Sequence, residues 1–497
     1  MNIIDKEEMK RIDIETQNKI PSIELMEDAG IKMAIKALKY YNPKNVLLFL
    51  GTGGNSGDAL VLGRYFIENN INVDAYIIDE IKNEDSKINL SKFKGKIIDY
   101  INFDNYDLLI DGIFGIGLSR RMNDKYIDII NKMNESNVDI ISLDIPSGID
   151  ATTGISYGAF IKSKLCITVE YIKTGMCLDN GLDSYKKIEV IKVGMNKPTD
   201  FIHLVNKTDF KNIFPERLRN TNKGSYHKAS IIAGSINYPG ASKIAYESLL
   251  SFKMGVGFAN LFVPESLYNL YALANPEIIT NKLKEKDGHI DFDKEKLDEI
   301  IKRSDSIAIG MGMQVSEELY NTIDYLLKNY NKNLLIDADG LNTLSKYGID
   351  ILKNKKCNVI LTPHLKEFER LSGKNIEYIK ENILTLPKKF AKEYNITLVL
   401  KSSSTIITDG NSIAIQKEGT TALAKAGSGD GLSGILCGLL AYLKEDTFKV
   451  ACLGSYILGI SACFSSKNNP DEVLTITEIV KNVSKVVKEI KKWWNFS

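Results

Sequence analysis

The stretch AKAGSGDGLSG (residues 424–434) places four glycines and two serines around a single carboxylate, Asp430. The apolar run GILCGLLAYL (434–443) follows it and predicts a buried helix. Glycines at the start of a helix leave backbone N–H groups exposed, and such groups can bind phosphate. A P-loop would add a lysine here, whereas this chain has an acid. We therefore predict that Asp430 acts on a proton of the substrate, the alternative being a helix-capping aspartate.

Short β-rich runs alternate with helical stretches in two successive halves of the chain. Examples are NVLLFLG (45–51) and YDLLIDG (106–112) in the first half, and KASIIAGS (228–235) and NVILTPH (358–364) in the second. Runs that are apolar on both faces predict buried parallel sheets, so we expect the α/β class. Because polar, loop-like sequence separates the halves, we predict two domains, residues 1–210 and 211–497.

The overall composition argues against several classes of partner. The chain has 64 Lys and Arg against 63 Asp and Glu, so no basic excess indicates nucleic-acid binding. The six cysteines form no CxxC pair, which is typical of thiols in a reducing compartment. The charged N-terminus does not resemble a signal peptide, and we expect no apolar run close to 18 residues. These features predict a cytoplasmic protein without membrane or nucleic-acid partners.

Three loops of the first half place polar residues directly after predicted strands. They are GTGGNSGD (51–58), DGIFGIGL (111–118) and LDIPSGID (143–150). Such strand ends are where open parallel sheets bind ligands. The side chains of Asn55, Asp58, Asp111, Asp144 and Ser147 offer hard oxygen ligands, which suit Mg²⁺, Ca²⁺ or K⁺. Taken singly, each is also compatible with a helix cap or a turn residue.

These three motifs, followed by EYIKTG (170–175), resemble in order the NAD(P)H-hydrate epimerase domain, with its Rossmann-like parallel α/β sandwich. The resemblance implies a bound K⁺ held by Asn55, Asp111 and Ser147. It implies catalysis by Asp144 and by Lys173, for which a solvated strand-end lysine is the alternative. The chain departs from the family's first loop at Gly54, Ser56 and Ala59. The residues implied to bind the hydrated dinucleotide are Gly54, Asn55, Ser56, Gly57, Asp58, Gly115, Ile116, Gly117, Leu118, Ser119, Arg120, Arg121 and Asp144.

The second half carries a different ordered set of motifs around Asp430. They are NKGSYHKASIIAGSINYPGAS (222–242), IGMGM (309–313), DADGLN (337–342), LTPHLKEFERL (361–371) and LKSSSTIIT (400–408). This set resembles the ADP- or ATP-dependent NAD(P)H-hydrate dehydratase, a branch with the ribokinase-like α/β fold. The resemblance implies that the hydrate contacts Ala241, Gly312, His364 and Asp430. It implies that ADP or AMP contacts Lys401, Ser402, Ser403, Ser404, Thr405, Gly427 and Gly429.

The resemblance also implies how the parts of this second site work. Glycine N–H groups stabilise the transferring phosphoryl, while Asp430 takes the proton of the attacking hydroxyl. Mg²⁺ accompanies the nucleotide, and Asp337 or Asp339 is a possible ligand. For His364, a purely structural role is the alternative to contact with the hydrate. Ser402 stands where the family usually has glycine.

Together the two halves predict a bifunctional repair enzyme for hydrated NADH and NADPH. The first would interconvert the R and S hydrates with K⁺, and the second would dehydrate the S form with ADP, giving AMP and phosphate. A ribokinase-like small-molecule kinase fused to a nucleotide-binding scaffold is the alternative. The sequence leaves open ADP against ATP, NADH hydrate against NADPH hydrate, and the oligomeric state, a homo-oligomer included.

Overall fold

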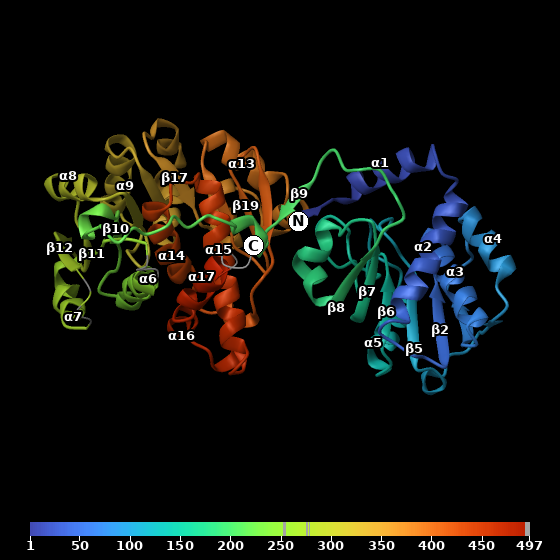
Figure 1. Ribbon diagram of the computed structural model, residues 1–497. Helices are drawn as coiled ribbons and strands as arrows, with labels where there is room; N and C mark the ends of the chain where they lie inside the picture. Colours follow the sequence, from blue (N-terminus) through green and yellow to red (C-terminus); the bar gives the residue numbers. More distant parts are fainter. Residues whose placement is uncertain (252–254, 275–276, 278, 493–497) are drawn as a thin grey trace. The chain divides into compact units, whose positions relative to one another are not determined.

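The computed structural model describes residues 1–251, 255–274, 277 and 279–492. The chain divides into two compact units, Met1–His203 and Leu204–Ser497, and each contains a mostly parallel sheet (Figure 1). The predicted α/β class is therefore confirmed. This division falls slightly before the predicted one at residue 210. Val205 and Phe210 are buried in the hydrophobic core of the second unit, which explains why the segment from residue 204 belongs there.

The first unit is built on a seven-stranded parallel sheet of order β4-β3-β2-β5-β6-β7-β8. Its strands are β2 (Asn45–Leu50), β3 (Asn72–Ile77), β4 (Lys96–Ile97), β5 (Leu108–Gly112), β6 (Ile140–Leu143), β7 (Ser163–Val169) and β8 (Tyr185–Ile191). Its helices are α1 (Lys6–Gln17), α2 (Ser22–Ala37), α3 (Gly54–Glu68), α4 (Glu84–Lys92) and α5 (Asp124–Glu135).

Side-chain alternation along β2 explains why this strand is apolar throughout. Leu48 belongs to one hydrophobic cluster, with residues of α2 and α3, whereas Leu47 and Phe49 belong to a second cluster with residues of α5. Successive side chains of a strand point to opposite faces of its sheet. Both faces of β2 are therefore covered, as the apolar runs predict.

The N-terminal segment is attached to the first unit by its backbone. Strand β1 (Asn2–Ile3) pairs antiparallel with β9 (Ile202–Leu204). The next residue, Ile4, donates its N–H to the carbonyl of Ile172 at 3.1 Å and accepts from the N–H of Thr174 at 2.9 Å. These bonds hold the start of α1 beside the end of β7.

In the second unit the sheet runs in the order β20-β19-β18-β17-β16-β15-β10-β11-β12. The pairs from β18 to β12 are parallel, and β18, β19 and β20 pair antiparallel. The strands are β10 (Lys228–Ile232), β11 (Phe258–Pro264), β12 (Ile279–Leu283), β15 (Ser306–Ile309), β16 (Asn333–Ile336), β17 (Asn358–Leu361), β18 (Thr397–Leu400), β19 (Thr405–Thr408) and β20 (Ile413–Gln416). A separate hairpin joins β13 (Glu285–Lys286) to β14 (His289–Ile290).

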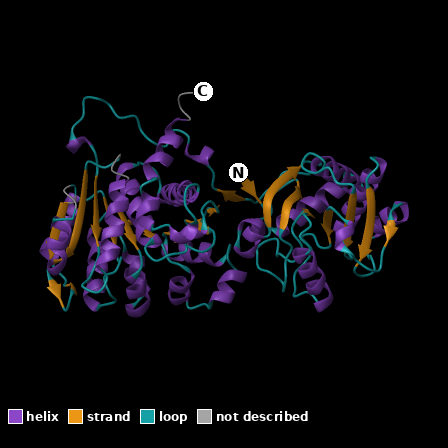
Figure 2. Ribbon diagram, turned by 90° about the horizontal axis from the view of Figure 1, so that it is seen from below, coloured by secondary structure: helices purple, strands orange, loops and turns teal. Residues whose placement is uncertain are grey.

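Helices lie on both sides of the strands in each unit (Figure 2). Those of the second unit are α6 (Pro239–Ser251), α7 (Tyr268–Ala272), α8 (Lys294–Arg303), α9 (Glu317–Asn329), α10 (Asp339–Tyr347), α11 (Leu365–Ser372), α12 (Ile376–Glu381), α13 (Leu386–Tyr394), α14 (Ser428–Tyr442), α15 (Thr447–Ser466), α16 (Ile476–Val480) and α17 (Val483–Lys492). From Gly431 to Tyr442 every residue of α14 is buried, which confirms the buried helix predicted after Asp430. Ser433, near the start of α14, donates to Asp337, which directly follows β16, so the N-terminus of α14 lies at the sheet's carboxyl edge.

Helix α15 corrects the expectation that no apolar run approaches 18 residues. It has 20 residues and is long and apolar enough to cross a membrane by length and composition alone. Most of it is nevertheless buried inside the second unit, where Leu453 and Ile457 belong to the main hydrophobic core. Its apolar composition is therefore explained as that of a core helix.

Candidate active sites

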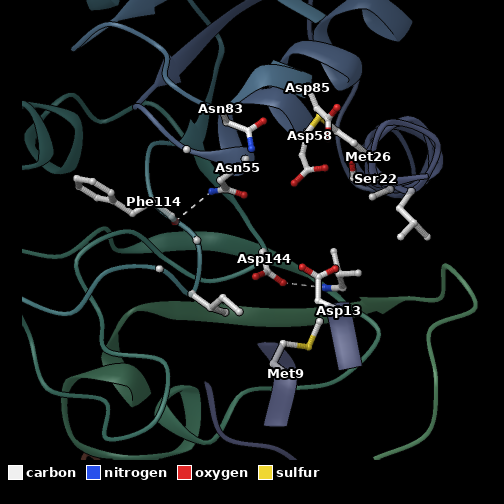
Figure 3. Close-up of a pocket in the computed structure, with 18 of the residues that line it drawn as sticks. Met9, Asp13, Ser22, Met26, Asn55, Asp58, Asn83, Asp85, Phe114 and Asp144 are labelled. Carbon is white, nitrogen blue, oxygen red and sulfur yellow. Dashed lines mark hydrogen bonds between the residues drawn. The ribbon is translucent and has the colours of Figure 1, made fainter. Parts of the chain in front are cut away.

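A cavity of about 730 Å³ opens in the first unit at the carboxyl ends of β2, β5 and β6. Figure 3 shows the side chains that face it. The predicted binding residues that line it are Gly54, Asn55, Asp58, Gly115, Ile116, Gly117, Leu118, Ser119, Arg120 and Asp144. The structure thus brings together loops that lie far apart in the sequence, at the edge where parallel sheets bind ligands.

Three residues predicted to contact the dinucleotide lie outside this lining. Ser56 is fully buried and donates its hydroxyl to the carbonyls of Gly51 and Gly112, each at 3.0 Å. A Cβ atom on Gly57 would lie 2.2 Å from the sulfur of Met26, so this glycine allows α2 and α3 to pack closely. Arg121 is exposed beside the loop. Ser56 and Gly57 therefore support the loop through packing and hydrogen bonds and do not line the cavity.

Two of the three predicted K⁺ ligands, Asn55 and Ser147, bond to the backbone of Phe114, and the third, Asp111, bonds to Ser147. Asn55 donates its amide to the carbonyl of Phe114 at 3.1 Å, and Ser147 Oγ accepts from the N–H of Phe114 at 2.9 Å. Ser147 Oγ also donates to Asp111 Oδ1 at 2.5 Å, and Asp111 Oδ2 accepts from Ser142 Oγ at 2.8 Å. One buried carboxylate and several neutral oxygens thus lie in one cluster.

A buried amide oxygen in this cluster has no hydrogen-bond partner. Asn55 Oδ1 is buried and unpaired, although buried polar atoms are normally satisfied. Within the described residues, no group of three or more His, Cys, Asp and Glu side chains could hold a metal ion. A donor set with a single carboxylate, Asp111, therefore fits a hard monovalent cation better than a transition metal.

Asp144, which lines the cavity, forms an ion pair with the fully buried Lys173. Asp144 adopts a left-handed backbone conformation (φ 63°) directly after β6, and Figure 3 shows its carboxylate facing the open space. Lys173 is 0% exposed and also donates to Thr168 Oγ1 at 2.8 Å and to the carbonyl of Val169 at 3.1 Å. A solvated strand-end lysine is therefore excluded, and these bonds hold the ammonium group of Lys173 against Asp144.

Sequence reasoning missed the wall of the cavity that α1 and α2 provide. Met9, Asp13 and Gln17 of α1 and Leu25 and Met26 of α2 all line the same space. None of them belongs to a glycine-rich loop or follows a strand, so no local pattern marked them. Contacts with distant segments bring α1 to the site, among them the backbone bonds of Ile4 beside the end of β7.

In the second unit, the buried Asp337 and the partly exposed Lys401 form an ion pair beside the glycine-rich start of α14. Lys401 Nζ lies 3.0 Å from Asp337 Oδ1, and Ser433 of α14 donates to Asp337 Oδ2 at 2.7 Å. A Cβ atom on Gly429 would lie 2.9 Å from Lys401 Nζ. The lysine is therefore positioned against the backbone that is predicted to bind phosphate.

Asp430 lies in the first turn of α14, close to this ion pair. Gly427 is the N-cap residue, in a left-handed conformation (φ 93°), and no side chain caps its helix end. Burial raises the pKa of Asp430 to about 7, the negative charges of Asp337, Asp339 and Glu367 add to this effect, and Lys401 opposes it. A pKa near neutrality suits a residue that gains and loses a proton. The capping interpretation has no support in this geometry.

His364 caps α11, and Glu367 completes the cap. Nδ1 of His364 accepts from the N–H groups of Lys366 and Glu367 at 3.1 Å, while the Glu367 carboxylate accepts from the N–H of His364 at 2.8 Å. Burial lowers the pKa of His364, with Lys401 contributing, so the ring is neutral and carries its proton on Nε2. The helix cap thus occupies Nδ1 of His364, whereas the Nε2–H takes no part in the cap and can donate to a ligand.

Glu367 was not predicted, although its environment resembles that of Asp430. Burial raises its pKa to about 7, and the charge of Asp337 adds to this, whereas Lys401 opposes it. The positive charge of Lys401 thus acts on three carboxyl groups, those of Asp337, Glu367 and Asp430. The spacing HxxE in LTPHLKEFERL was the available signal, because a residue three positions after an N-cap returns to it.

The structure also brings together two of the predicted hydrate contacts, Ala241 and Gly312, at the carboxyl ends of the neighbouring strands β10 and β15. A Cβ atom on Gly312 (φ 62°) would lie 2.8 Å from Ala241 Cβ and 2.9 Å from Tyr238 Cβ. Both residues follow strands of the sheet, β15 and β10. Tyr238, which was not predicted, is 58% exposed beside them and offers an aromatic face.

The turn after β18 presents the predicted nucleotide-binding residues in different ways. Ser402, whose hydroxyl donates to the carbonyl of Ser404 at 2.7 Å, and Ser403 are exposed, Thr405 is partly buried, and Ser404 is buried. Asp337, a possible Mg²⁺ ligand, already accepts from Lys401, Ser433 and the N–H of Ala338. Asp339 accepts from the N–H of Gln314 at 2.9 Å.

Known proteins resemble both units. Residues 229–485 match the family described as NAD(P)H-hydrate dehydratase, and residues 22–175 match the YjeF-related protein N-terminus. The bifunctional NAD(P)H-hydrate repair enzyme Nnr of Dictyoglomus turgidum is 30% identical over 517 residues, which cover 99% of each chain.

Two solved structures resemble the second unit. One is the ADP/ATP-dependent NAD(P)H-hydrate dehydratase of Bacillus subtilis, crystallised with ATP and Mg²⁺ (TM-score 0.51, 25% identity, 58% of this chain and 99% of that one). A ribokinase-like superfamily protein of Enterococcus faecalis, 21% identical, has the same fold (TM-score 0.50, 59% of this chain and 99% of that one). The predicted resemblance and the ribokinase-like fold are thereby confirmed, and the chain belongs to the family of bifunctional NAD(P)H-hydrate repair enzymes.

Proposed function

We propose that the two units repair hydrated NADH and NADPH in two consecutive reactions. The first unit interconverts the R and S hydrates by inverting the hydroxyl-bearing carbon of the ring. The second unit dehydrates the S form with ADP, releasing AMP and phosphate. Together they return both epimers to the reduced dinucleotide.

The observation that carries the second reaction is Asp430 beside the ion pair of Lys401 and Asp337. Asp430 accepts the proton of the hydrate's hydroxyl, whose oxygen attacks the terminal phosphorus of ADP while the phosphoanhydride bond breaks and AMP leaves. The N–H groups at the start of α14 and Lys401 stabilise the transferred phosphoryl. Phosphate then leaves the ring with the C–O electron pair, the neighbouring carbon loses a proton, and the double bond reforms.

Cations complete this proposal. K⁺ is held in the first unit by Asn55, Asp111 and Ser147, and the support is the buried, unpaired Asn55 Oδ1 within that cluster. Mg²⁺ enters the second unit with the nucleotide, where it offsets the negative charge of the phosphates. Because the oxygens of Asp337 are already engaged, Asp339 is the better candidate of the two aspartates for a Mg²⁺ ligand.

The cellular location and the binding partners are part of the same proposal. The six cysteines, all within the described residues, form no disulfide, which fits a reducing cytoplasm. The proposed partners are the hydrates of NADH and NADPH and the nucleotide, and they include neither nucleic acid nor a membrane. The two sites are also compatible with a homo-oligomer.

The test is to incubate the protein with NADH hydrate and either ADP or ATP, following both epimers by chromatography and NADH by its absorbance. With ADP and K⁺ we expect both epimers to disappear and NADH to form. Faster conversion with ATP than with ADP would identify ATP as the phosphoryl donor. A stable phosphorylated alcohol in place of NADH would contradict the proposed reaction.

A further inference from the structure

Helix α1 forms one wall of the first-unit cavity and is held there by several contacts. Lys6 is buried and donates its Nζ to the carbonyl of Leu118 at 2.8 Å, within the predicted dinucleotide-binding loop. Its N–H donates to Thr152 Oγ1 at 3.1 Å. Ile4, two residues before Lys6, is bonded to Ile172 and Thr174, the two neighbours of Lys173 in the chain. The placement of α1 against the cavity is therefore fixed at its N-terminal end.

Three carboxylates from three separate elements line this cavity. Asp13 comes from α1, Asp58 from α3 and Asp144 from the end of β6, and Figure 3 shows them around one space. The buried Lys173 pairs with Asp144. The other charged side chains of the lining are Asp85 and Arg120.

The surroundings of these carboxylates favour retention of protons. Burial raises the pKa of Asp58 well above its ordinary range, the charges of Asp144 and Asp13 raise it further, and Lys173 opposes them. Burial also raises the pKa of Asp13. A hydrogen bond from Gln17 opposes this increase, and the negative charge of Asp144 adds to it. The cavity thus holds one carboxylate paired with Lys173, together with two carboxyl groups whose surroundings favour the protonated form.

Inversion of a carbon that bears a hydroxyl and a ring nitrogen needs such groups. A carboxyl protonates the hydroxyl, the C–O bond breaks, and water leaves with the electron pair. The nitrogen lone pair forms a C=N bond, so the ring becomes a cation. Water then attacks the carbon from the opposite face, and its proton passes to a carboxylate. Neighbouring carboxylates stabilise the intermediate positive charge.

We propose that Asp13 takes part in this inversion, together with Asp58 and Asp144, as proton donor and as counter-charge to the ring cation. The proposal rests on the epimerase function of the first unit. It assigns the N-terminal helix to the reaction itself, in addition to its contact with the loop at Leu118.

The test compares Asp13→Asn with Asp13→Glu and with Glu7→Gln in the full-length chain. Glu7 is a matched control because it lies on the same helix, with its side chain 76% exposed. Epimerisation is measured from pure R hydrate with K⁺ and without nucleotide, so that the second reaction is silent. We expect kcat of Asp13→Asn to fall about 100-fold, as for loss of an acid–base group, with KM and melting temperature unchanged. Asp13→Glu should recover part of the rate, and Glu7→Gln should be normal.

The outcomes separate this inference from the function on which it rests. A wild-type chain that does not epimerise the R hydrate above the uncatalysed rate would contradict the proposed function itself. If the wild type epimerises and Asp13→Asn does so equally fast, the role of Asp13 is wrong. A lower melting temperature without recovery in Asp13→Glu would also overturn it, since Asp13 would then be structural.

Discussion

Replacing Asp430 by asparagine separates its proposed chemistry from a structural role. The substitution keeps the shape of the side chain and removes its ability to take a proton. A general base contributes about 10²–10⁴-fold to a rate, or about 3–5.5 kcal/mol of activation free energy. We therefore expect dehydration of the S hydrate to fall at least about 100-fold at saturating substrate and ADP.

The structure predicts that this variant remains folded. No side chain caps the first turn of α14, so the substitution removes no cap. The pKa of Asp430 is raised to about 7, so the folded protein disfavours the ionised carboxylate. The free energy of unfolding therefore falls as pH rises from the pKa of this group in the unfolded chain to about 7. Asparagine carries no charge, and above that pH the variant should melt at or above the wild-type temperature.

The assay compares dehydration, epimerisation, ADP affinity and melting temperature in wild type and Asp430→Asn. Epimerisation should be unchanged, because it takes place in the other unit, and ADP should bind at least as tightly once a negative charge is removed. Near-normal dehydration by a folded variant would refute the role of Asp430 as the base.

Three other predictions test separate parts of the account. Dehydration by wild type should increase with pH up to about 7 and level off above it, because Asp430 must be ionised to accept a proton, and a profile that is flat through pH 7 would contradict this. Asp111→Ala should slow epimerisation and flatten its response to added K⁺ while dehydration of pure S hydrate is unaffected; an unchanged K⁺ titration would show that the cation lies elsewhere. Lys6→Met should raise KM for the hydrate in epimerisation more than it lowers kcat, because the loop at Leu118 loses its anchor, and equal kinetics would exclude that positioning role.

The sequence predicts the fold and the loop residues of both sites because each has a local signal. Apolar strands such as β2 and the glycine-rich turn before α14 are visible as short patterns, and Asp144 and Asp430 occur within such patterns. The pairing of Lys401 with Asp337 has no local signal, since the two residues lie 64 positions apart.

Contacts made through packing account for what sequence reasoning missed. Asp13 belongs to a polar helix whose position depends on the backbone bonds of Ile4, and nothing in its own segment indicates a cavity. Glu367 reads as a surface residue of α11 until folding buries it beside Lys401. In both cases the chemistry depends on burial among residues from distant segments.

The central claim is that one chain converts both hydrates to the reduced dinucleotide through Asp430 and the first-unit cavity. The most direct measurement supplies wild-type protein with K⁺, ADP and a mixture of R and S NADH hydrates, and quantifies NADH and AMP until the reaction stops. We expect complete consumption of both epimers, with one AMP formed for each NADH. A reaction that stops once the S form is consumed, or AMP that forms without NADH, would contradict it.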